Sequence, residues 1–466
     1  MLDTFKNNNP GYKIQESSFR DPGGFLFYDD TKLLRQINLC YKEDYDFLCK
    51  SGLYEKLGKK GLLIKHKELE DHHGMTDSAY KIIEPEKISF ISYPYEWCFS
   101  QLKDAAITTL KIQKTALQNG MTLKDASAYN IQFQHGKPVF IDTLSFEKYI
   151  ENKPWAAYKQ FCQHFLAPLA LMTYTDIRLN QLMKIYLDGI PLDLTVKLLP
   201  IKTKFKFSLL MHLHMHAKAQ KKYQHKGGSA KNIKITKARQ LAVIQSLMSA
   251  IKKLRIKAQF TEWGDYYNFT NYTNKAFASK KEIITDYIKS IKPKAVWDLG
   301  ANTGEFTRIA GEFGAKCVAF DIDPLAVESG YNNVKKRKIK NILPLILDLT
   351  NPSPPIGWNN EERTGIKSRP LPDAVFALAL IHHLAISNNL PFQKIASFLG
   401  ELSDNLIIEF VPKSDSQVQK LLESRKDIFG NYNIGAFVKE FEKVFIIKEQ
   451  KRVADSERVL FWMQKR

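Results

Sequence analysis

The sequence predicts an α/β fold in which a doubly wound parallel sheet forms the C-terminal part and an α+β domain precedes it. Three observations support this prediction. From Lys281 onward, short apolar runs alternate with helical apolar periods, which is typical of β-α-β units. A glycine-containing turn separates the first of these runs from the next helix. A hairpin pattern stands near the N-terminus.

The C-terminal strands are expected where short apolar runs end in polar residues or glycine, because strands of a parallel sheet are buried on both faces. The expected strands are Ala295–Leu299, Lys316–Phe320, Ile342–Leu347, Ala374–Leu380, Asn405–Phe410, Val444–Ile447 and Arg458–Met463. Amphipathic helices are expected between them. After Gly304, for example, Phe306, Ile309 and Phe313 share one helical face, and Gly314 marks the end of that helix.

The N-terminal part begins with a predicted hairpin. Residues 21–24 (Asp-Pro-Gly-Gly) form a turn, Phe25–Tyr28 a strand, and Asp29-Asp30 a second turn before the next strand at Leu33-Leu34. Mixed helices and strands follow to about Pro200. Residues 1–200 are therefore expected to form an α+β domain.

The positive charge of the chain is unevenly distributed. The sequence has 69 Lys and Arg against 49 Asp and Glu, a net charge of +20. Residues 201–260 hold 15 of these cations and no acidic residue, and Ala238–Ile256 has the apolar spacing of an amphipathic helix. We therefore expect 201–260 to be a basic helical connector, with a third domain at 261–466. Its charge fits an anionic partner, either RNA or a membrane surface, or simply a solvated helix face.

Other features limit the class of protein. Hydrophobic residues make up 44% of the sequence and charged residues 25%, which excludes a wholly disordered or fibrous chain. Five scattered cysteines without a CxxC pair argue against a disulfide scaffold or a zinc site, so no metal site is expected. No apolar run is long enough to span a membrane, and the polar N-terminus is not a signal peptide. The expected location is cytoplasmic.

Acidic residues and glycines stand where the first three C-terminal strands end. The first strand runs into Asp298-Leu299-Gly300, with Gly304 before the next helix. The second strand ends at Asp321 and the third at Asp348. Glycines permit close approach of backbone to ligand, and an acid at the tip of the second strand can accept hydrogen bonds from a ribose diol. The pattern indicates a nucleoside-containing cofactor at the carboxyl ends of the strands.

This pattern resembles the class I S-adenosylmethionine-dependent methyltransferases. The resemblance covers roughly residues 262–466 and implies a Rossmann-like methyltransferase sheet with S-adenosylmethionine as its cofactor. It implies that the glycine turn holds the methionine half, that Asp321 holds the ribose, and that Asp348 flanks the adenine. The residues it assigns to the cofactor are Asp298, Gly300, Asn302, Gly304, Asp321, Asp348 and Leu349.

The ends of the fourth and fifth strands supply candidates for the acceptor side. His383 is the first candidate for a general base, because imidazole titrates near neutral pH, and His382 and Glu409 are its substitutes. An aromatic flap is expected at 263–272. The long loop 351–363 is expected to cover the adenine side or the acceptor pocket.

Three short runs resemble a narrower group. Residues 351–354 (Asn-Pro-Ser-Pro), 381–384 (Ile-His-His-Leu) and 408–413 (Ile-Glu-Phe-Val-Pro-Lys) are similar to the NoeA-type nodulation-associated methyltransferases and their bacterial relatives. That resemblance extends into the N-terminal half. It implies a methyltransferase and leaves the acceptor, an O or N nucleophile, undefined.

The N-terminal half carries a second resemblance. Asp125, Asn130 and Asp142 are spaced like the catalytic base and the two magnesium ligands of protein-kinase-like phosphotransferases. The glycine turn at 21–24 lacks the series of backbone N–H groups with which a phosphate-covering loop binds phosphates. Arg35 stands about where the ATP-binding lysine belongs. The resemblance implies a degenerate kinase-like domain. The alternative functions are a bifunctional kinase-methyltransferase and a non-catalytic module that binds RNA or a membrane surface.

Overall fold

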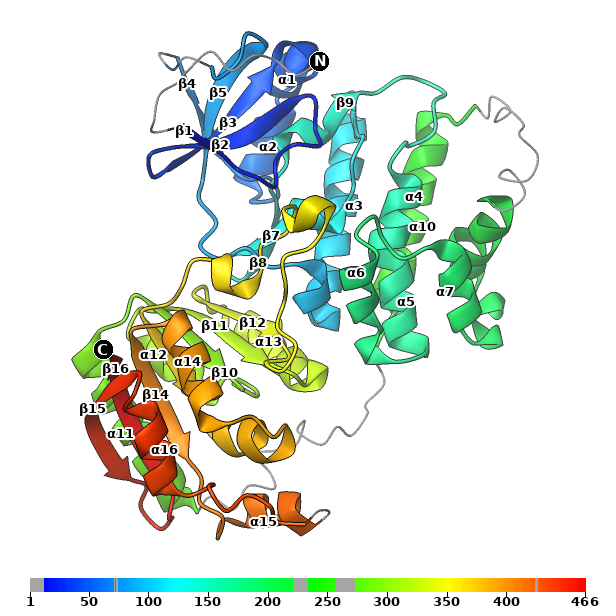
Figure 1. Cartoon of the computed structure of the whole chain (residues 1–466). Helices are drawn as coiled ribbons and strands as arrows, with labels where there is room; N and C mark the ends of the chain where they lie inside the picture. Colours follow the sequence, from blue (N-terminus) through cyan, green and yellow to red (C-terminus); the bar gives the residue numbers. More distant parts are fainter. Residues whose placement is uncertain (1–11, 71, 73, 221–233, 257–272, 424–425) are drawn as a thin grey trace. The chain divides into compact units, whose positions relative to one another are not determined.

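The computed structural model describes residues 12–70, 72, 74–220, 234–256, 273–423 and 426–466 (Figure 1). The chain divides into two compact units. The first comprises Met1–Lys257 together with Pro355–Thr364, and the second comprises Ala258–Pro354 and Gly365–Arg466. The expected aromatic flap at 263–272 lies outside the described residues. No described helix has the length and hydropathy needed to cross a membrane.

A seven-stranded sheet forms the centre of the second unit, in the order β12-β11-β10-β13-β14-β16-β15. Its strands are β10 (Ala295–Leu299), β11 (Lys316–Asp321), β12 (Ile342–Ile346), β13 (Ala374–Ala377), β14 (Asn405–Phe410), β15 (Phe445–Arg452) and β16 (Val459–Lys465). Adjacent strands from β12 to β14 are parallel, and β16 runs antiparallel to both of its neighbours. The expected doubly wound sheet is confirmed, and each of the seven expected strands has a counterpart in it, although the bounds of some strands differ.

Helices cover both faces of this sheet. They are α11 (Asn274–Ile291), α12 (Glu305–Glu312), α13 (Pro324–Arg337), α14 (Phe392–Leu402), α15 (Ser416–Glu423) and α16 (Ile434–Phe441). On one face, Ile284 of α11 and Ala310 of α12 share a core with Ile407 of β14. On the other face, Phe437 of α16 packs against Phe410 of β14, with ring centroids 5.2 Å apart. Residues three apart on one strand point to opposite faces, so both faces are buried.

The fourth strand is shorter than expected. Ala374–Leu380 was expected to be extended, but β13 ends at Ala377. Ala379 has a φ of 49°, which lies in the left-handed region and carries the chain out of the sheet. His383 therefore falls in a short π-helical turn, His383–Ser387, and not on a strand tip.

The first unit opens with a five-stranded antiparallel sheet in the order β1-β2-β3-β5-β4. Its strands are β1 (Tyr12–Ile14), β2 (Gly24–Asp29), β3 (Lys32–Asn38), β4 (His66–Leu69) and β5 (Ala79–Pro85), with α1 (Lys42–Lys50) and α2 (Leu53–Lys59) between β3 and β4. The pairing of β2 with β3, which places Phe27 opposite Leu34, confirms the expected hairpin.

The rest of the first unit is mainly helical. The long helix α3 (Phe99–Gln118) is followed by two short antiparallel pairs, β6 (Met121–Leu123) with β9 (Phe146–Lys148) and β7 (Ile131–Gln134) with β8 (Lys137–Phe140). The helices α4 (Tyr158–Phe161), α5 (Ala167–Tyr174), α6 (Leu182–Ile185), α7 (Leu192–Leu198), α8 (Phe207–Leu209) and α10 (Lys237–Lys253) complete it.

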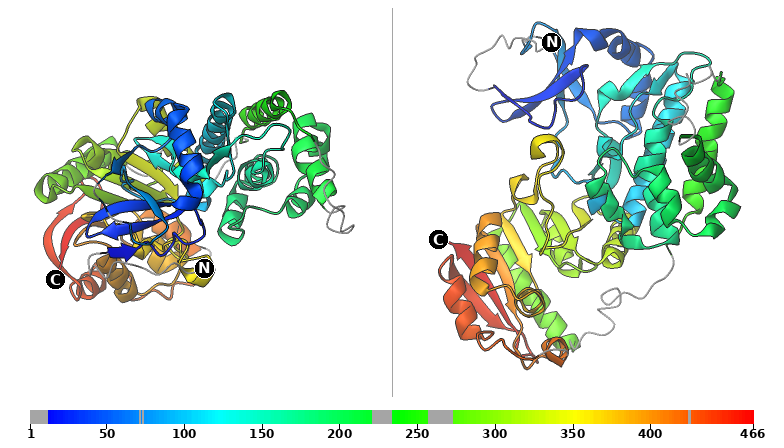
Figure 2. Two further views of the ribbon diagram at one scale, coloured as in Figure 1. Left: turned by 90° about the horizontal axis from the view of Figure 1, so that it is seen from above. Right: turned by 45° about the vertical axis from the view of Figure 1, so that its right-hand side comes forward.

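The expectation of a separate basic connector at 201–260 is wrong for its described residues. They belong to the first unit, and α10 lies among its helices (Figure 2). The apolar stripe of α10 is buried, with Ile244 and Ile251 almost inaccessible to solvent. The Lys103 ammonium of α3 donates to the Leu254 carbonyl oxygen at 2.7 Å. Burial of this stripe makes the segment part of the unit, while its lysines remain at the surface.

The long loop after the third strand divides between the two units. Residues 355–364 belong to the first unit, and residues 351–354 belong to the second. The Thr364 amide donates to the Tyr93 hydroxyl at 2.8 Å, and the Arg363 guanidinium lies 4.2 Å from the ring centroid of Tyr129. Arg20 forms an ion pair with the buried Glu362. These polar side chains find their partners at distant positions in the sequence, which local patterns do not reveal.

Candidate functional site

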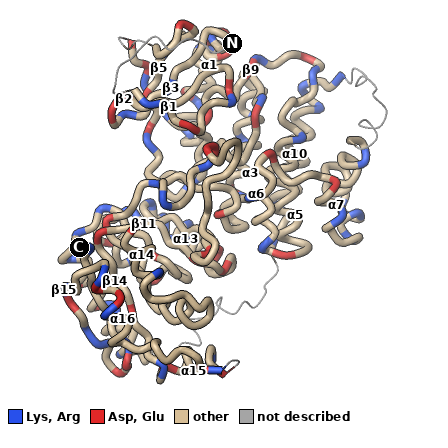
Figure 3. Tube along the Cα trace, in the orientation of Figure 1, with Lys and Arg blue, Asp and Glu red and all other residues tan. Residues whose placement is uncertain are grey.

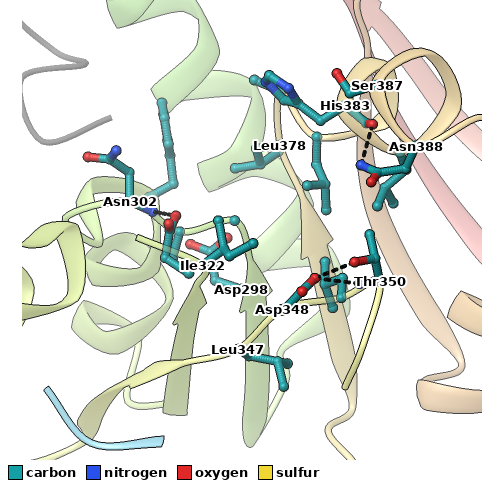
Figure 4. Close-up of a pocket in the computed structure, with 18 of the residues that line it drawn as sticks. Asp298, Asn302, Ile322, Leu347, Asp348, Thr350, Leu378, His383, Ser387 and Asn388 are labelled. Atoms are coloured by element: carbon teal, nitrogen blue, oxygen red, sulfur yellow. Dashed lines mark hydrogen bonds between the residues drawn. The ribbon is translucent and has the colours of Figure 1, made fainter. Parts of the chain in front are cut away.

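A cavity of about 340 Å³ opens in the second unit where β10, β11, β12 and β13 end (Figure 4). This volume lies within the range of small-molecule sites, and the carboxyl edge of an open parallel sheet is where such folds bind ligands. Six of the seven residues expected to bind the cofactor are on its wall, namely Asp298, Gly300, Asn302, Asp321, Asp348 and Leu349. Gly304 lies just beyond it, as the residue that precedes α12.

The glycine turn forms one side of the cavity. Gly300 has a φ of 76°, and a Cβ there would lie 3.3 Å from a methyl carbon of Leu380 across the cavity wall. The Gly300 and Ala301 amides both donate to the Phe320 carbonyl oxygen, at 2.9 and 2.8 Å. The turn is therefore fixed to β11. Glycine is required at position 300 both for its conformation and for the space it leaves.

Asp298 stands at the end of β10 with 2% of its surface exposed. Its carboxylate accepts a hydrogen bond from the Thr307 hydroxyl of α12 at 2.6 Å. Burial raises the pKa of Asp298 to about 6, although the Thr307 bond and the nearby Lys280 ammonium both lower it. A charge kept in so little water is strongly attracted to any cation or donor that enters the cavity.

Asp321 ends β11 and faces the same space. One carboxylate oxygen accepts from the Asn302 amide and the other from the Asp323 amide, both at 2.8 Å. Burial raises the pKa of Asp321 to about 6 in spite of these two bonds. The two carboxylate oxygens offer about four lone-pair sites in all, so at neutral pH the group can still accept a hydrogen bond from a ligand.

Asp348 lies in the loop after β12, on the opposite side of the cavity from the glycine turn. Its carboxylate accepts from the amide and the hydroxyl of Thr350, at 2.8 and 2.6 Å, as Figure 4 shows. The apolar side chains of Leu347 and Leu349 border the cavity beside it. This side of the cavity therefore places two apolar side chains next to one carboxylate.

His383 lies on the wall, on the side formed by the turn after β13 (Figure 4). Burial, together with the nearby Arg458 guanidinium, lowers the pKa of His383 to about 4. The imidazole is thus neutral at physiological pH and able to accept a proton. The His382 ring lies beside it, with centroids 4.1 Å apart and planes tilted by 41°, but His382 is buried and not on the wall.

Glu409 is not on the cavity wall either. It is fully buried, and the Lys280 ammonium lies 2.6 Å from its carboxylate, while Arg458 is 3.8 Å from the other oxygen. Lys280, from α11, is itself on the wall. Burial lowers the pKa of Lys280, although Glu409 opposes this. Glu409, expected as a substitute base, therefore holds Lys280 in place.

Sequence reasoning did not assign a role to Lys280. The signal was present, because Lys280 stands four and seven residues before Ile284 and Tyr287, which are buried. That spacing places the lysine on the apolar face of α11. A lysine on the buried face of a helix requires a partner, and Glu409 is the carboxylate that ends an apolar strand nearby in space.

The three acidic and amide residues singled out in the N-terminal half also come together. The Asn130 side chain hydrogen-bonds to Asp125 and donates to the Ser145 hydroxyl, which in turn donates to Asp142. The Arg35 guanidinium lies 2.6 Å from the other oxygen of Asp142. Burial alone would raise the pKa of Asp142, but Arg35 and these hydrogen bonds hold it below its usual value. Within the described ranges, no group of three or more His, Cys, Asp or Glu is placed to hold a metal ion.

Among solved structures, three that resemble the chain each match less than half of it. The PH0226 protein from Pyrococcus horikoshii OT3 is 16% identical, with 45% of this chain and 100% of that chain covered and a TM-score of 0.30. Magnesium protoporphyrin IX methyltransferase (ChlM) from Synechocystis PCC 6803, with bound SAH, is 15% identical, with coverages of 44% and 93% and a TM-score of 0.31. The N-methyltransferase NodS from Bradyrhizobium japonicum WM9 is 10% identical, with coverages of 41% and 97% and a TM-score of 0.30.

No protein-family model matches the chain. A full-length relative is the nodulation protein NoeA of Rhizobium meliloti (strain 1021). The two are 34% identical over 456 residues, which cover 96% of this chain and 95% of NoeA. The similarity includes both units and is not confined to the sheet that holds the cavity. The chain therefore belongs to the family of the nodulation protein NoeA.

Proposed function

We propose that the second unit is an S-adenosylmethionine-dependent methyltransferase acting on an O or N nucleophile. The observation that carries the proposal is the cavity at the carboxyl edge of the sheet, where a glycine turn and three strand-end carboxylates meet. The sheet order and the placement of these residues support a ligand with a ribose, a flat apolar base and a charged tail.

The wall residues suggest how the cofactor would be held. Asp321, whose carboxylate borders the cavity, would accept hydrogen bonds from the ribose hydroxyls. Leu349 and Asp348 would border the adenine on its apolar face and its polar edge. The turn from Gly300 to Gly304 leaves room for the methionine half to approach the backbone.

Lys280 is proposed to bind the carboxylate of the methionine half. Its ammonium is almost fully buried and lies on the wall, beside the ring of Phe306 at 4.5 Å from the centroid. Glu409 fixes its position and keeps it charged against the cost of burial. A positioned cation in a site with little water is an effective partner for a ligand carboxylate.

The bound cofactor supplies a methyl group on a sulfonium, which is transferred by in-line displacement. Such a transfer depends mainly on positioning and on exclusion of water, with modest help from a base. His383 is the proposed base, because its neutral imidazole faces the cavity and can take the proton of an acceptor hydroxyl or amine. His382 and Glu409 would act through their neighbours, since neither is on the wall.

For the N-terminal unit we propose a degenerate kinase-like domain without phosphoryl transfer. Support comes from the convergence of Asp125, Asn130 and Asp142 beside a five-stranded antiparallel sheet. Asp142, the proposed metal ligand, is already engaged by Arg35 and Ser145. An arginine fork paired with this carboxylate competes with magnesium for the same oxygens. The unit would therefore serve as a scaffold or in acceptor recognition.

The cofactor proposal is tested by Asp321→Ala. Loss of hydrogen bonds to a charged group costs about 1.5–3 kcal/mol, so affinity for S-adenosylmethionine is expected to fall by about 10- to 150-fold. Asp373→Ala is the matched control, because Asp373 also accepts from two backbone amides, at 2.7 and 2.8 Å, at the opposite edge of the same sheet. Calorimetry that gives the same affinity for Asp321→Ala and the parent would overturn the assignment.

The role of Lys280 is tested by comparing two ligands. Lys280→Met is expected to weaken S-adenosylmethionine binding by about tenfold or more, whereas adenosine, which lacks the carboxylate, should bind nearly as before. Lys280→Arg keeps the charge and should retain most of the affinity. The exposed neighbour Lys281, changed to Met, controls for general loss of charge. An equal loss for both ligands would contradict a specific contact with the methionine half.

The N-terminal proposal is tested on the full chain with ATP and magnesium. We expect no release of ADP above background, since Asp142 is occupied by Arg35. We also expect Asp142→Ala to leave S-adenosylmethionine affinity unchanged, because Asp142 and the cavity belong to different units. Magnesium-dependent ADP release that disappears in Asp142→Ala would instead favour a bifunctional kinase-methyltransferase.

A further inference from the structure

The first unit presents a surface strip on which large apolar and basic side chains alternate. Phe205 and Phe207 are 85% and 74% exposed, more than any other large hydrophobic residue that the structure describes. Ile201 is 71% exposed, and Lys202, Lys204 and Lys206 lie between these three residues in the sequence. We call these six residues the Lys-Phe strip. Exposed apolar side chains gathered in this way mark an interaction site.

The strip is held firmly by its inward-facing neighbours. The buried Thr203 hydroxyl donates to the Pro200 carbonyl oxygen at 2.7 Å and lies 2.9 Å from a ring nitrogen of His214. His212 is fixed between the Tyr158 hydroxyl at 2.7 Å and the Ser246 hydroxyl at 2.9 Å. The exposure of Phe205 and Phe207 is thus a feature of packed structure and not of a frayed end.

The lysines of the strip are not neutralised by acidic residues of their own segment. No acidic residue occurs anywhere from 201 to 260. Among the described residues, Lys202, Lys204 and Lys206 form no ion pair, and the Lys206 ammonium lies 5.8 Å from the ring centroid of Tyr174. Figure 3 shows basic positions close to α7, which precedes the strip. The strip therefore offers uncompensated positive charge beside its apolar groups.

The first unit exposes further large apolar side chains. They are Ile185 at 72%, Leu198 at 38%, Met211 at 40% and Met215 at 51% exposed. Together with the three apolar residues of the strip these make seven large side chains, and five of them are aliphatic or thioether groups, at Ile185, Leu198, Ile201, Met211 and Met215. Such groups have no π-face on which a nucleic-acid base can stack, but they gain from entry into lipid as much as phenylalanine does.

We propose that the Lys-Phe strip binds the surface of an anionic lipid membrane. Phe205, Phe207 and Ile201 would enter the boundary between head groups and acyl chains, and the three lysines would lie among the anionic head groups. The described helices include none able to span a membrane, so the contact is peripheral. The proposal is independent of the methyltransferase assignment, since the strip and the cavity belong to different units.

The proposal is tested by sedimentation of the full chain with vesicles. The protein is expected to pellet with phosphatidylcholine vesicles that contain about one-third phosphatidylglycerol, and much less with phosphatidylcholine alone. Phe205→Ser/Phe207→Ser should weaken this binding by at least about tenfold. Lys202→Gln/Lys204→Gln/Lys206→Gln should weaken it by a similar factor and flatten its dependence on salt.

Matched changes elsewhere serve as controls. Phe313→Ser removes another exposed phenylalanine, and Lys289→Gln/Lys336→Gln/Lys340→Gln removes the same charge from the second unit. Both should bind vesicles nearly as the parent does, with all variants unfolding at the same temperature. Equal pelleting with both vesicle types, or unchanged binding in the Phe205→Ser/Phe207→Ser variant, would overturn the proposal. The proposal would also be overturned if the protein bound a uridine oligonucleotide of about 20 nucleotides tightly, and if the two phenylalanines were needed for that binding but not for binding to vesicles.

Discussion

The buried ion pair between Lys280 and Glu409 is the interaction on which the arrangement of the cavity depends. It links α11 to β14 through a 2.6 Å contact in which both side chains are almost completely removed from water. Removing charges from water is costly, and the cost is offset only when the pair has good geometry and further partners. Arg458 supplies one further partner by lying 3.8 Å from Glu409 while it binds Asp415 at 2.7 Å. The pair thus places a cation in the cavity wall.

Burial away from water also raises the pKa values of two acidic residues of the cavity wall. Asp298 and Asp321 each have at least one strong hydrogen bond, yet burial still raises the pKa of both to about 6. The ionised groups are therefore under-solvated in the protein and would gain from donors that a ligand brings. The neutral His383 on the same wall completes a set of one cation, several carboxylates and one base. This combination is what the proposed cofactor and methyl transfer require.

Much of the second unit was predictable because its strands are short apolar runs with acids or glycine at their ends. Gly300, Asp321 and Asp348 were identified from the sequence by that local pattern, and the structure brings all three to one cavity. Lys280 was missed because its partner Glu409 is 129 residues away. His383 was ranked ahead of His382 from the sequence, and the structure places His383, but not His382, on the cavity wall after the turn at Ala379.

Predictions that depended on long-range packing were less successful. The excess of positive charge in 201–260 predicted a connector between domains. Burial of Ile244 and Ile251 instead makes α10 part of the first unit. The loop 355–364 is polar and long, and its partners Tyr93 and Tyr129 make it part of the first unit, which its sequence did not indicate. In both cases the deciding contacts join residues far apart in the sequence.

The central claim is that the cavity of the second unit holds S-adenosylmethionine or its demethylated product. A crystal structure of the full chain grown with saturating S-adenosylhomocysteine tests this most directly. The account predicts the ligand in the cavity, with its ribose hydroxyls within hydrogen-bond distance of Asp321 and its carboxylate beside Lys280. An empty cavity at saturating ligand, or a ligand bound elsewhere on the chain, would contradict it.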